Sequence, residues 1–186
     1  MVSLLGFLVF FGFLVGSPFM NPLGDIWGRA IAYKISMVMH IVGNICLLLS
    51  HSLYLHYISL FIIGFASSGR VGIGHIWLLE HLPNNKQSHY TTIMRVIDAL
   101  MPLIVSILFE YGLPSWRLIF YGTLCASIFC LIGSFFIPES SKYLLSMNRI
   151  VAAKRNMKRI ARWNGTYDEI FWKDFNFEEN PFDYAS

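Results

Sequence analysis

The sequence predicts an all-α fold, a multi-pass bundle of transmembrane helices. Five apolar stretches occupy nearly all of residues 1–138, and each has the roughly 17–25 residues that a helix needs to cross a bilayer. Charged residues make up only 13% of the 186 residues, against about 25% in an ordinary soluble domain. Backbone N–H and C=O groups cannot bond to water inside hydrocarbon, so only helices and closed β-barrels span a membrane. The irregular positions of Gly and Pro in these stretches do not fit the alternating pattern of a barrel strand. We therefore expect an integral membrane protein.

The five spans follow one another closely along the chain. We expect them at residues 2–20, 31–50, 54–79, 91–112 and 118–137. The first lacks a basic leading region and is too long for a secretory signal, so it is interpreted as a span. In the third, Gly64, Ser68 and Gly72 recur every four residues, which favours close approach of another helix. This small-residue face is also a candidate contact for another protein.

The basic residues predict how the bundle is oriented. Lys and Arg follow the first, third and fifth spans, whereas residues 51–53 and 113–115, between the other spans, contain neither. Because basic loops stay on the cytoplasmic side, the C-terminus is expected inside and the N-terminus outside. The organelle is not indicated.

After the fifth span the chain becomes polar. Residues 139–163 have apolar residues at helical spacing with basic residues largely opposite, which predicts a basic amphipathic surface helix. It either lies along the membrane on anionic headgroups or packs on its own bundle as an ordinary solvated helix. Residues 164–186 form an acidic tail with many aromatic side chains, which are expected to dock on a protein surface.

Three charged residues within the spans are functional candidates by default: Arg70, Arg95 and Asp98. Each isolated charge costs about 2.5–3.5 kcal/mol on insertion scales, so partners are expected. Arg95 and Asp98 are three residues apart on one helix and can pair. Arg70 has three candidate partners: an anionic solute in a polar cavity, an acidic group of another subunit, or a lipid headgroup.

Three short motifs, in order along the chain, carry a resemblance to a known family. Residues 21–29 read Asn-Pro-Leu-Gly-Asp-Ile-Trp-Gly-Arg, Glu80 is followed by Pro83 and Lys86, and residues 138–145 read Pro-Glu-Ser-Ser-Lys-Tyr-Leu-Leu. They resemble signatures of the major facilitator superfamily, the last one being similar to sugar porters and organic-ion transporters. The resemblance covers residues 2–165. It corresponds to helices two to six of the N-terminal half, lacking the first helix and the second half.

The resemblance also implies roles for residues. In the family, the loop aspartate and arginines help to latch one of two global states. Asp25, Gly28 and Arg29 match that signature loop, but Ile26 replaces an arginine, and Leu60 stands where the fourth helix normally has one. One exposed ion pair is worth about 0–1 kcal/mol, so we expect a remnant of a gate. The helix-end motifs contribute Glu80, Pro138, Glu139, Ser140 and Lys142.

Two functions are weighed. The first is a transporter-derived, non-transporting accessory subunit of a larger membrane protein assembly. The alternative is part of a functional transporter of small organic solutes, sugars or organic ions, which needs a complementary half-transporter because the family places its site between two halves. Partners are thus the lipid bilayer and other membrane protein subunits. No catalytic, cofactor-binding, metal-binding or nucleic-acid motif is found, so no enzyme is expected.

Overall fold

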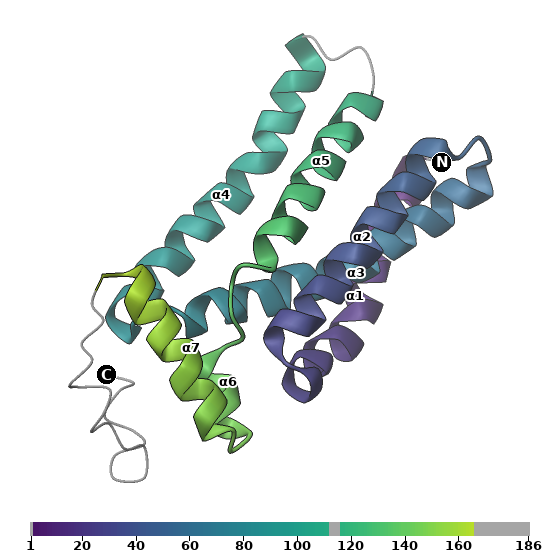
Figure 1. Ribbon diagram of the computed structural model, residues 1–186. Helices are drawn as coiled ribbons and strands as arrows, with labels where there is room; N and C mark the ends of the chain where they lie inside the picture. The colour runs from purple at the N-terminus through teal and green to yellow at the C-terminus, as the bar shows by residue number, and fades with distance from the viewer. Residues whose placement is uncertain (1, 112–115, 166–186) are drawn as a thin grey trace.

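The computed structural model describes residues 2–111 and 116–165, and all regular structure in that part is helical (Figure 1). Five long helices come first, and each is long and apolar enough to cross a membrane. They are α1 (Val2–Trp27), α2 (Arg29–Leu49), α3 (Leu53–Glu80), α4 (Asn84–Tyr111) and α5 (Trp116–Ser134). Two shorter helices follow, α6 (Ser141–Ser146) and α7 (Ile150–Trp163). The predicted all-α multi-pass bundle is confirmed.

Helix α3 is the centre of the bundle, because it packs against both α1 and α2. Glycines make the closest approach: a Cβ at Gly64 would collide with the carbonyl of Val9, and a Cβ at Gly12 would collide with the carbonyl of Phe61. Such glycine contacts are typical of membrane helices. The Gly64–Gly72 face is therefore covered by α1, within this chain.

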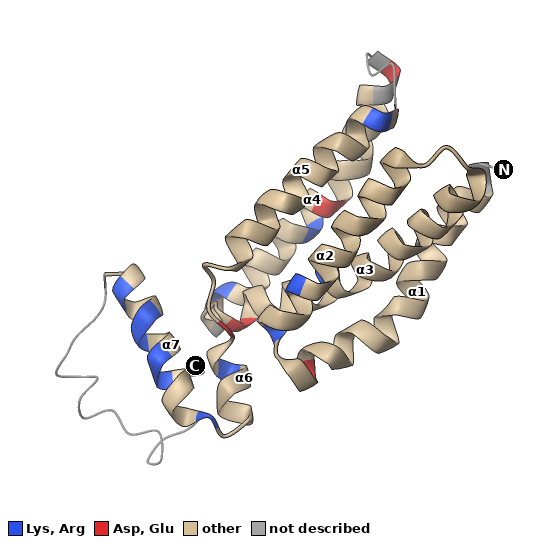
Figure 2. Ribbon diagram, turned by 45° about the vertical axis from the view of Figure 1, so that its right-hand side comes forward, with Lys and Arg blue, Asp and Glu red and all other residues tan. Residues whose placement is uncertain are grey.

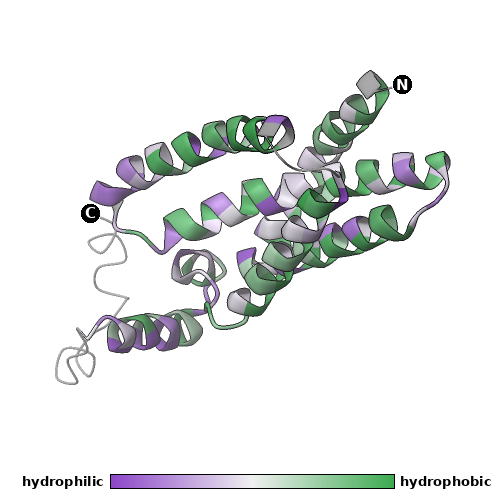
Figure 3. Ribbon diagram, turned by 90° about the horizontal axis from the view of Figure 1, so that it is seen from above, coloured by the Kyte–Doolittle hydropathy of each residue, from purple (hydrophilic) through white to green (hydrophobic). Residues whose placement is uncertain are grey.

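Helices α4 and α5 lie at the side of the bundle (Figure 1). Helix α2 contacts α5, but no residue in the apolar window of α4 is buried within the chain. Both helices have an apolar window long enough to span a membrane and carry exposed large apolar side chains, and Figure 3 shows such hydrophobic positions along the long helices, interrupted by polar ones. Their large apolar side chains are left for lipid or for other protein surfaces.

Some helices extend beyond the expected spans, because polar residues next to the apolar stretch also belong to the helix. Helix α1 continues to Trp27 through the expected loop, with Pro18 and Pro22 inside it, and α2 begins directly after Gly28. Helix α4 begins right after Pro83, at Asn84 rather than at residue 91. The length of an apolar stretch reflects the thickness of the hydrocarbon layer. The helix itself ends only where its backbone hydrogen bonds stop.

The segment 139–163 forms two helices instead of one. Ser140 caps α6, its hydroxyl accepting a hydrogen bond from the Tyr143 amide at 3.2 Å. The chain then turns through Asn148, whose φ is 56°. The apolar side of α7 packs on α6, with Ala153 against Tyr143 and Leu144. The acidic tail expected over 164–186 lies, from residue 166 onward, outside the described residues.

Candidate functional site

Arg29, the first residue of α2, joins α1 and α3 at the end of the bundle next to α6, a helix whose position Figure 2 shows. Its Nη1 lies 2.9 Å from Asp25 Oδ1, and its Nε lies 3.2 Å from Glu80 Oε1 at the end of α3. The Asp25 side chain is 72% exposed, whereas those of Arg29 and Glu80 are 17% and 16% exposed. The expected Asp25–Arg29 pair is present, but the better shielded partner of Arg29 is Glu80.

Glu139 caps helix α2 from a distant part of the chain. Gly28 precedes α2 and has no side chain to accept the first amide hydrogens. The Glu139 carboxylate takes that role, accepting from the Ala30 amide at 3.0 and 3.2 Å, and from the Ser140 amide at 3.0 Å. A negative charge at this position also complements the positive end of the helix dipole.

Gly28 allows this docking for two reasons. Its φ of 103° is a conformation that residues with a Cβ rarely adopt. A Cβ there would also lie 2.5 Å from Glu139 Oε2 and 3.2 Å from Tyr143 Cε1. Tyr143 completes the contact: its hydroxyl donates to the Ile26 carbonyl at 3.0 Å, and the Arg29 guanidinium lies 5.0 Å from its ring centroid.

Most of the signature and helix-end residues thus meet in one place. We call Asp25, Gly28, Arg29, Glu80, Glu139 and Tyr143 the loop network. Trp77 Nε1 anchors its edge by donating to the Pro138 carbonyl at 3.3 Å, and Ser140 is buried beneath it as the α6 cap. Lys142 is exposed on α6. The network ties α1, α2, α3 and α6 together.

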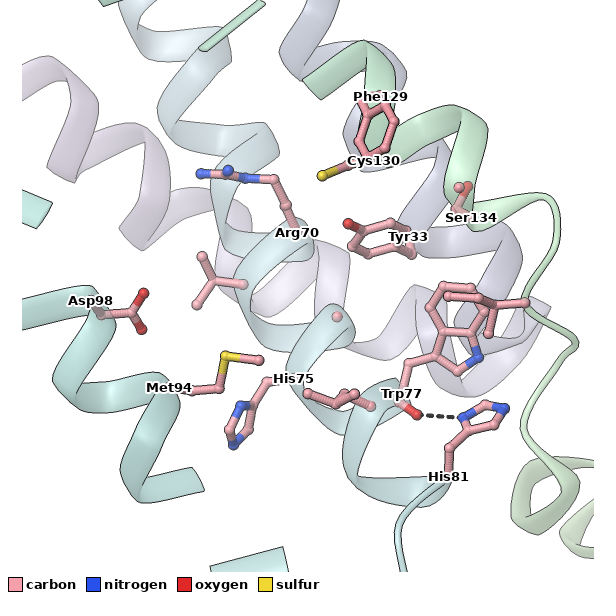
Figure 4. A pocket seen from close by; sticks show the side chains of 15 residues that line it. Tyr33, Arg70, His75, Trp77, His81, Met94, Asp98, Phe129, Cys130 and Ser134 are labelled. Atoms are coloured by element: carbon pink, nitrogen blue, oxygen red, sulfur yellow. Dashed lines mark hydrogen bonds between the residues drawn. The ribbon is translucent and has the colours of Figure 1, made fainter. Parts of the chain in front are cut away.

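A cavity of about 680 Å³ lies among α2, α3, α4 and α5. Its volume is within the roughly 300–1,000 Å³ of small-molecule sites. Most of its wall surface is apolar, and, in addition to charged residues, polar atoms come from Tyr33, His75, His81 and Ser134. In Figure 4, Met94 and Asp98 approach from α4, while Tyr33, Cys130 and Ser134 lie across from them.

Two of the predicted intramembrane charges line this cavity. Arg70 comes from α3 and Asp98 from α4 (Figure 4). Neither makes a hydrogen bond or ion pair with another described residue, and Arg70 Nε is buried without a hydrogen-bond partner there. Opposite charges that stay unpaired in a low-dielectric wall strongly attract complementary ions. The cavity can therefore hold a charged group.

Arg95 is placed differently. It is exposed on α4, it is absent from the cavity wall, and the structure shows no ion pair between it and Asp98 among the described residues. Side chains three residues apart on an α-helix point about 60° away from each other around the helix axis. Their spacing therefore allows an ion pair but does not require one. Sequence reasoning missed Tyr33 and Trp77 as cavity residues, because aromatic spacing alone does not distinguish a cavity wall from a core.

The chain is similar in sequence to several known proteins. The chain is 33% identical over 163 residues to "Solute carrier family 22 member 6" of Pseudopleuronectes americanus, covering 85% of this chain and 28% of that protein. It is 29% identical over 150 residues to "Glucose transporter GlcP" of Staphylococcus epidermidis, covering 79% and 33%. With human "Solute carrier family 22 member 2", it shares 26% identity over 154 residues, covering 83% and 28%.

The chain thus spans about a third or less of the length of these relatives. The family model described as "Major Facilitator Superfamily" matches residues 1–159, which include every helix of the bundle and the loop network. The resemblance read from the three motifs is therefore confirmed, and the chain belongs to the major facilitator superfamily.

Proposed function

We propose that this chain forms one wall of a membrane transporter for small organic solutes, and that Arg70 binds an anionic group of the solute. The observation that carries the proposal is the cavity in which Arg70 and Asp98 are left without partners among the described residues. A charge kept in a membrane helix without a protein partner is favoured where an ion binds. The relatives' names, a solute carrier and a glucose transporter, support a transport role over an enzymatic one.

The loop network supports the same reading. The sequence suggested one weak, exposed ion pair, too little to bias a conformational equilibrium. Arg29 contacts a second carboxylate that is largely shielded, and Glu139 adds three hydrogen bonds to the same corner. Linked charge contacts of this kind can hold one state of a two-state element. The case for an eroded gate is correspondingly weaker.

We place the loop network on the cytoplasmic side. Arg29 lies over Tyr143 of α6, Lys34 lies beside Phe135 just after α5, and Figure 2 shows basic residues on α6 and α7 at this end of the bundle. The rule that basic loops stay inside supports that orientation, with the α2–α3 connection at residues 50–52 on the opposite side.

A non-transporting accessory subunit is the second candidate. The observation that favours it is the surface of α4, whose apolar window has no residue buried within this chain. Such a surface fits a neighbouring membrane protein, and a complementary half-transporter would cover it equally well. The exposed surface of α4 is compatible with both candidates, and a measurement of uptake separates them.

The test uses the protein purified from its own membrane in mild detergent, with whatever co-purifies, and reconstituted into liposomes. Uptake is measured for benzenesulfonate, tetraethylammonium and glucose, which represent an organic anion, an organic cation and a sugar. We expect saturable benzenesulfonate uptake that falls at least tenfold in Arg70→Gln. Arg155→Gln is the control, because Arg155 is exposed on α7 and lies outside both the cavity and the loop network. A stable assembly that takes up none of the three would favour the accessory role.

A further inference from the structure

The outward side of α7 carries a basic stripe that the transporter proposal does not use. Five residues share this side and are exposed. They are Val151, Arg155, Arg159, Arg162 and Trp163, which we call the outer face of α7. Residues three and four apart are neighbours on a helix surface, so the basic side chains lie in a row. Figure 2 shows the basic residues along this helix.

The outer face is distinct from the apolar side of the helix. Ala153 is fully buried, and Ile150, Met157 and Ala161 pack towards α6. An ordinary interfacial helix would insert that apolar side into lipid. Here α6 covers part of that side, so the exposed basic outer face is the more open surface of α7 for a ligand.

The outer face is also held in a fixed orientation. Asn156 Nδ2 donates to the Glu139 carbonyl at 3.0 Å, which fastens α7 to the segment that caps α2. At the end of the stripe, the Arg159 guanidinium lies 4.7 Å from the Trp163 ring centroid, and the Trp163 side chain is 56% exposed. A tryptophan beside cations is typical of the headgroup level of a membrane.

The position of α7 relative to the bilayer follows from the end of α5. Phe135, Phe136 and Ile137 are exposed apolar residues directly after α5, and Lys34 Nζ lies 4.8 Å from the Phe135 ring centroid. An exposed apolar run with a lysine beside it is expected where hydrocarbon meets headgroups. Helix α6 starts at Ser141, so α6 and α7 come immediately after this boundary.

We propose that the outer face of α7 binds the headgroups of anionic lipids in the adjacent leaflet. Arg155 and Arg159 supply the attraction, since neither is ion-paired with a described residue. Val151 and Trp163 make shallow apolar contacts beside them. Each basic residue near an anionic surface increases binding by about fivefold, so the two arginines together contribute about 25-fold. Salt weakens this attraction by screening.

The full chain in mild detergent is titrated with phosphatidylserine or with phosphatidylcholine of the same acyl chains, and native mass spectrometry counts the bound lipids. We expect wild type to prefer phosphatidylserine. Arg155→Gln/Arg159→Gln should lower that preference about 25-fold, whereas Arg155→Lys/Arg159→Lys should retain it. Arg117→Gln, which removes a cation at the other end of the bundle, is the matched control and should change nothing. All variants are first checked for an unchanged apparent Tm.

Equal preference in wild type and the double Gln variant would overturn the proposal. Loss of preference in the double Lys variant would also do so, because the charge is still present there.

Discussion

The loop network and the cavity place charged residues in opposite situations. In the loop network, Arg29 contacts two carboxylates and a backbone carbonyl, and Glu139 accepts from two backbone amides. In the cavity, Arg70 and Asp98 have no such partner among the described residues. Each region holds a buried atom without a hydrogen-bond partner among the described residues, Glu80 Oε2 in the loop network and Arg70 Nε in the cavity. Glu80 is nevertheless ion-paired with Arg29 through its other oxygen, whereas Arg70 has no ion pair with a described residue, and an unpaired charge in a membrane helix is a candidate for binding a ligand. Substitutions in the two regions should therefore separate stability from solute binding.

The largest effect on stability is expected at Gly28. Gly28→Ala forces a Cβ into the left-handed region and against the Glu139 carboxylate. The free energy of unfolding should fall by about 2–4 kcal/mol. Unfolding in increasing mole fractions of denaturing detergent measures it. Gly165→Ala is the control, because its φ is 70° but nothing lies within 4 Å of its Cβ. It should lose only about 1–2 kcal/mol, and an equal loss in both variants would argue against the docking.

Glu139 comes next. Glu139→Ala leaves the amides of Ala30 and Ser140 without their acceptor and removes the negative charge at the start of α2. We expect a loss of about 2 kcal/mol in unfolding free energy. Glu139→Gln, whose amide oxygen can still accept, should lose about 1 kcal/mol. If the alanine variant melts like wild type, Glu139 does not cap α2.

The two partners of Arg29 should differ because their exposure differs. Glu80→Gln removes a carboxylate that is 16% exposed and should lower the unfolding free energy by about 1 kcal/mol. Asp25→Asn removes one that is 72% exposed, and its effect should stay below about 0.5 kcal/mol. The same denaturation series measures both. A larger loss for Asp25→Asn would reverse the assignment of the stronger pair.

The smallest change in stability is expected for Arg70→Gln. No described hydrogen bond or ion pair is lost, and the glutamine is less costly in an apolar wall. The unfolding free energy should stay within about 0.5 kcal/mol of wild type or rise. A loss as large as that of Glu80→Gln would indicate that Arg70 supports the fold.

The fold was predictable, because apolar length alone identifies membrane spans. Helix ends were less so: the chain from Asn21 to Trp27 looks like a loop by composition, yet its backbone continues α1. The hydrophobic pattern of a sequence indicates which residues are buried or lie in the membrane. It does not indicate how far backbone hydrogen bonding continues into a polar helix end.

The candidate site was predictable by residue but not by contact. The motifs singled out Asp25, Arg29, Glu80 and Glu139, but the Arg29–Glu80 and Ala30–Glu139 contacts join residues 51 and 109 positions apart. Local spacing predicted a pair between Asp98 and Arg95 on the same helix, whereas in the structure Asp98 lines the cavity and Arg95 does not. Such contacts follow from how the helices pack, which a single sequence does not specify.

The central claim is that Arg70 binds a ligand whereas Glu80 stabilises the fold. The most direct test is the change in apparent Tm that an added anion produces. Apparent Tm is measured for the natively purified wild type, Arg70→Gln and Glu80→Gln, with and without benzenesulfonate. We predict that benzenesulfonate raises the Tm of wild type and of Glu80→Gln by the same amount, although Glu80→Gln starts lower, and leaves Arg70→Gln unchanged. A shift in Arg70→Gln equal to that of wild type would contradict the assignment of Arg70 to the solute.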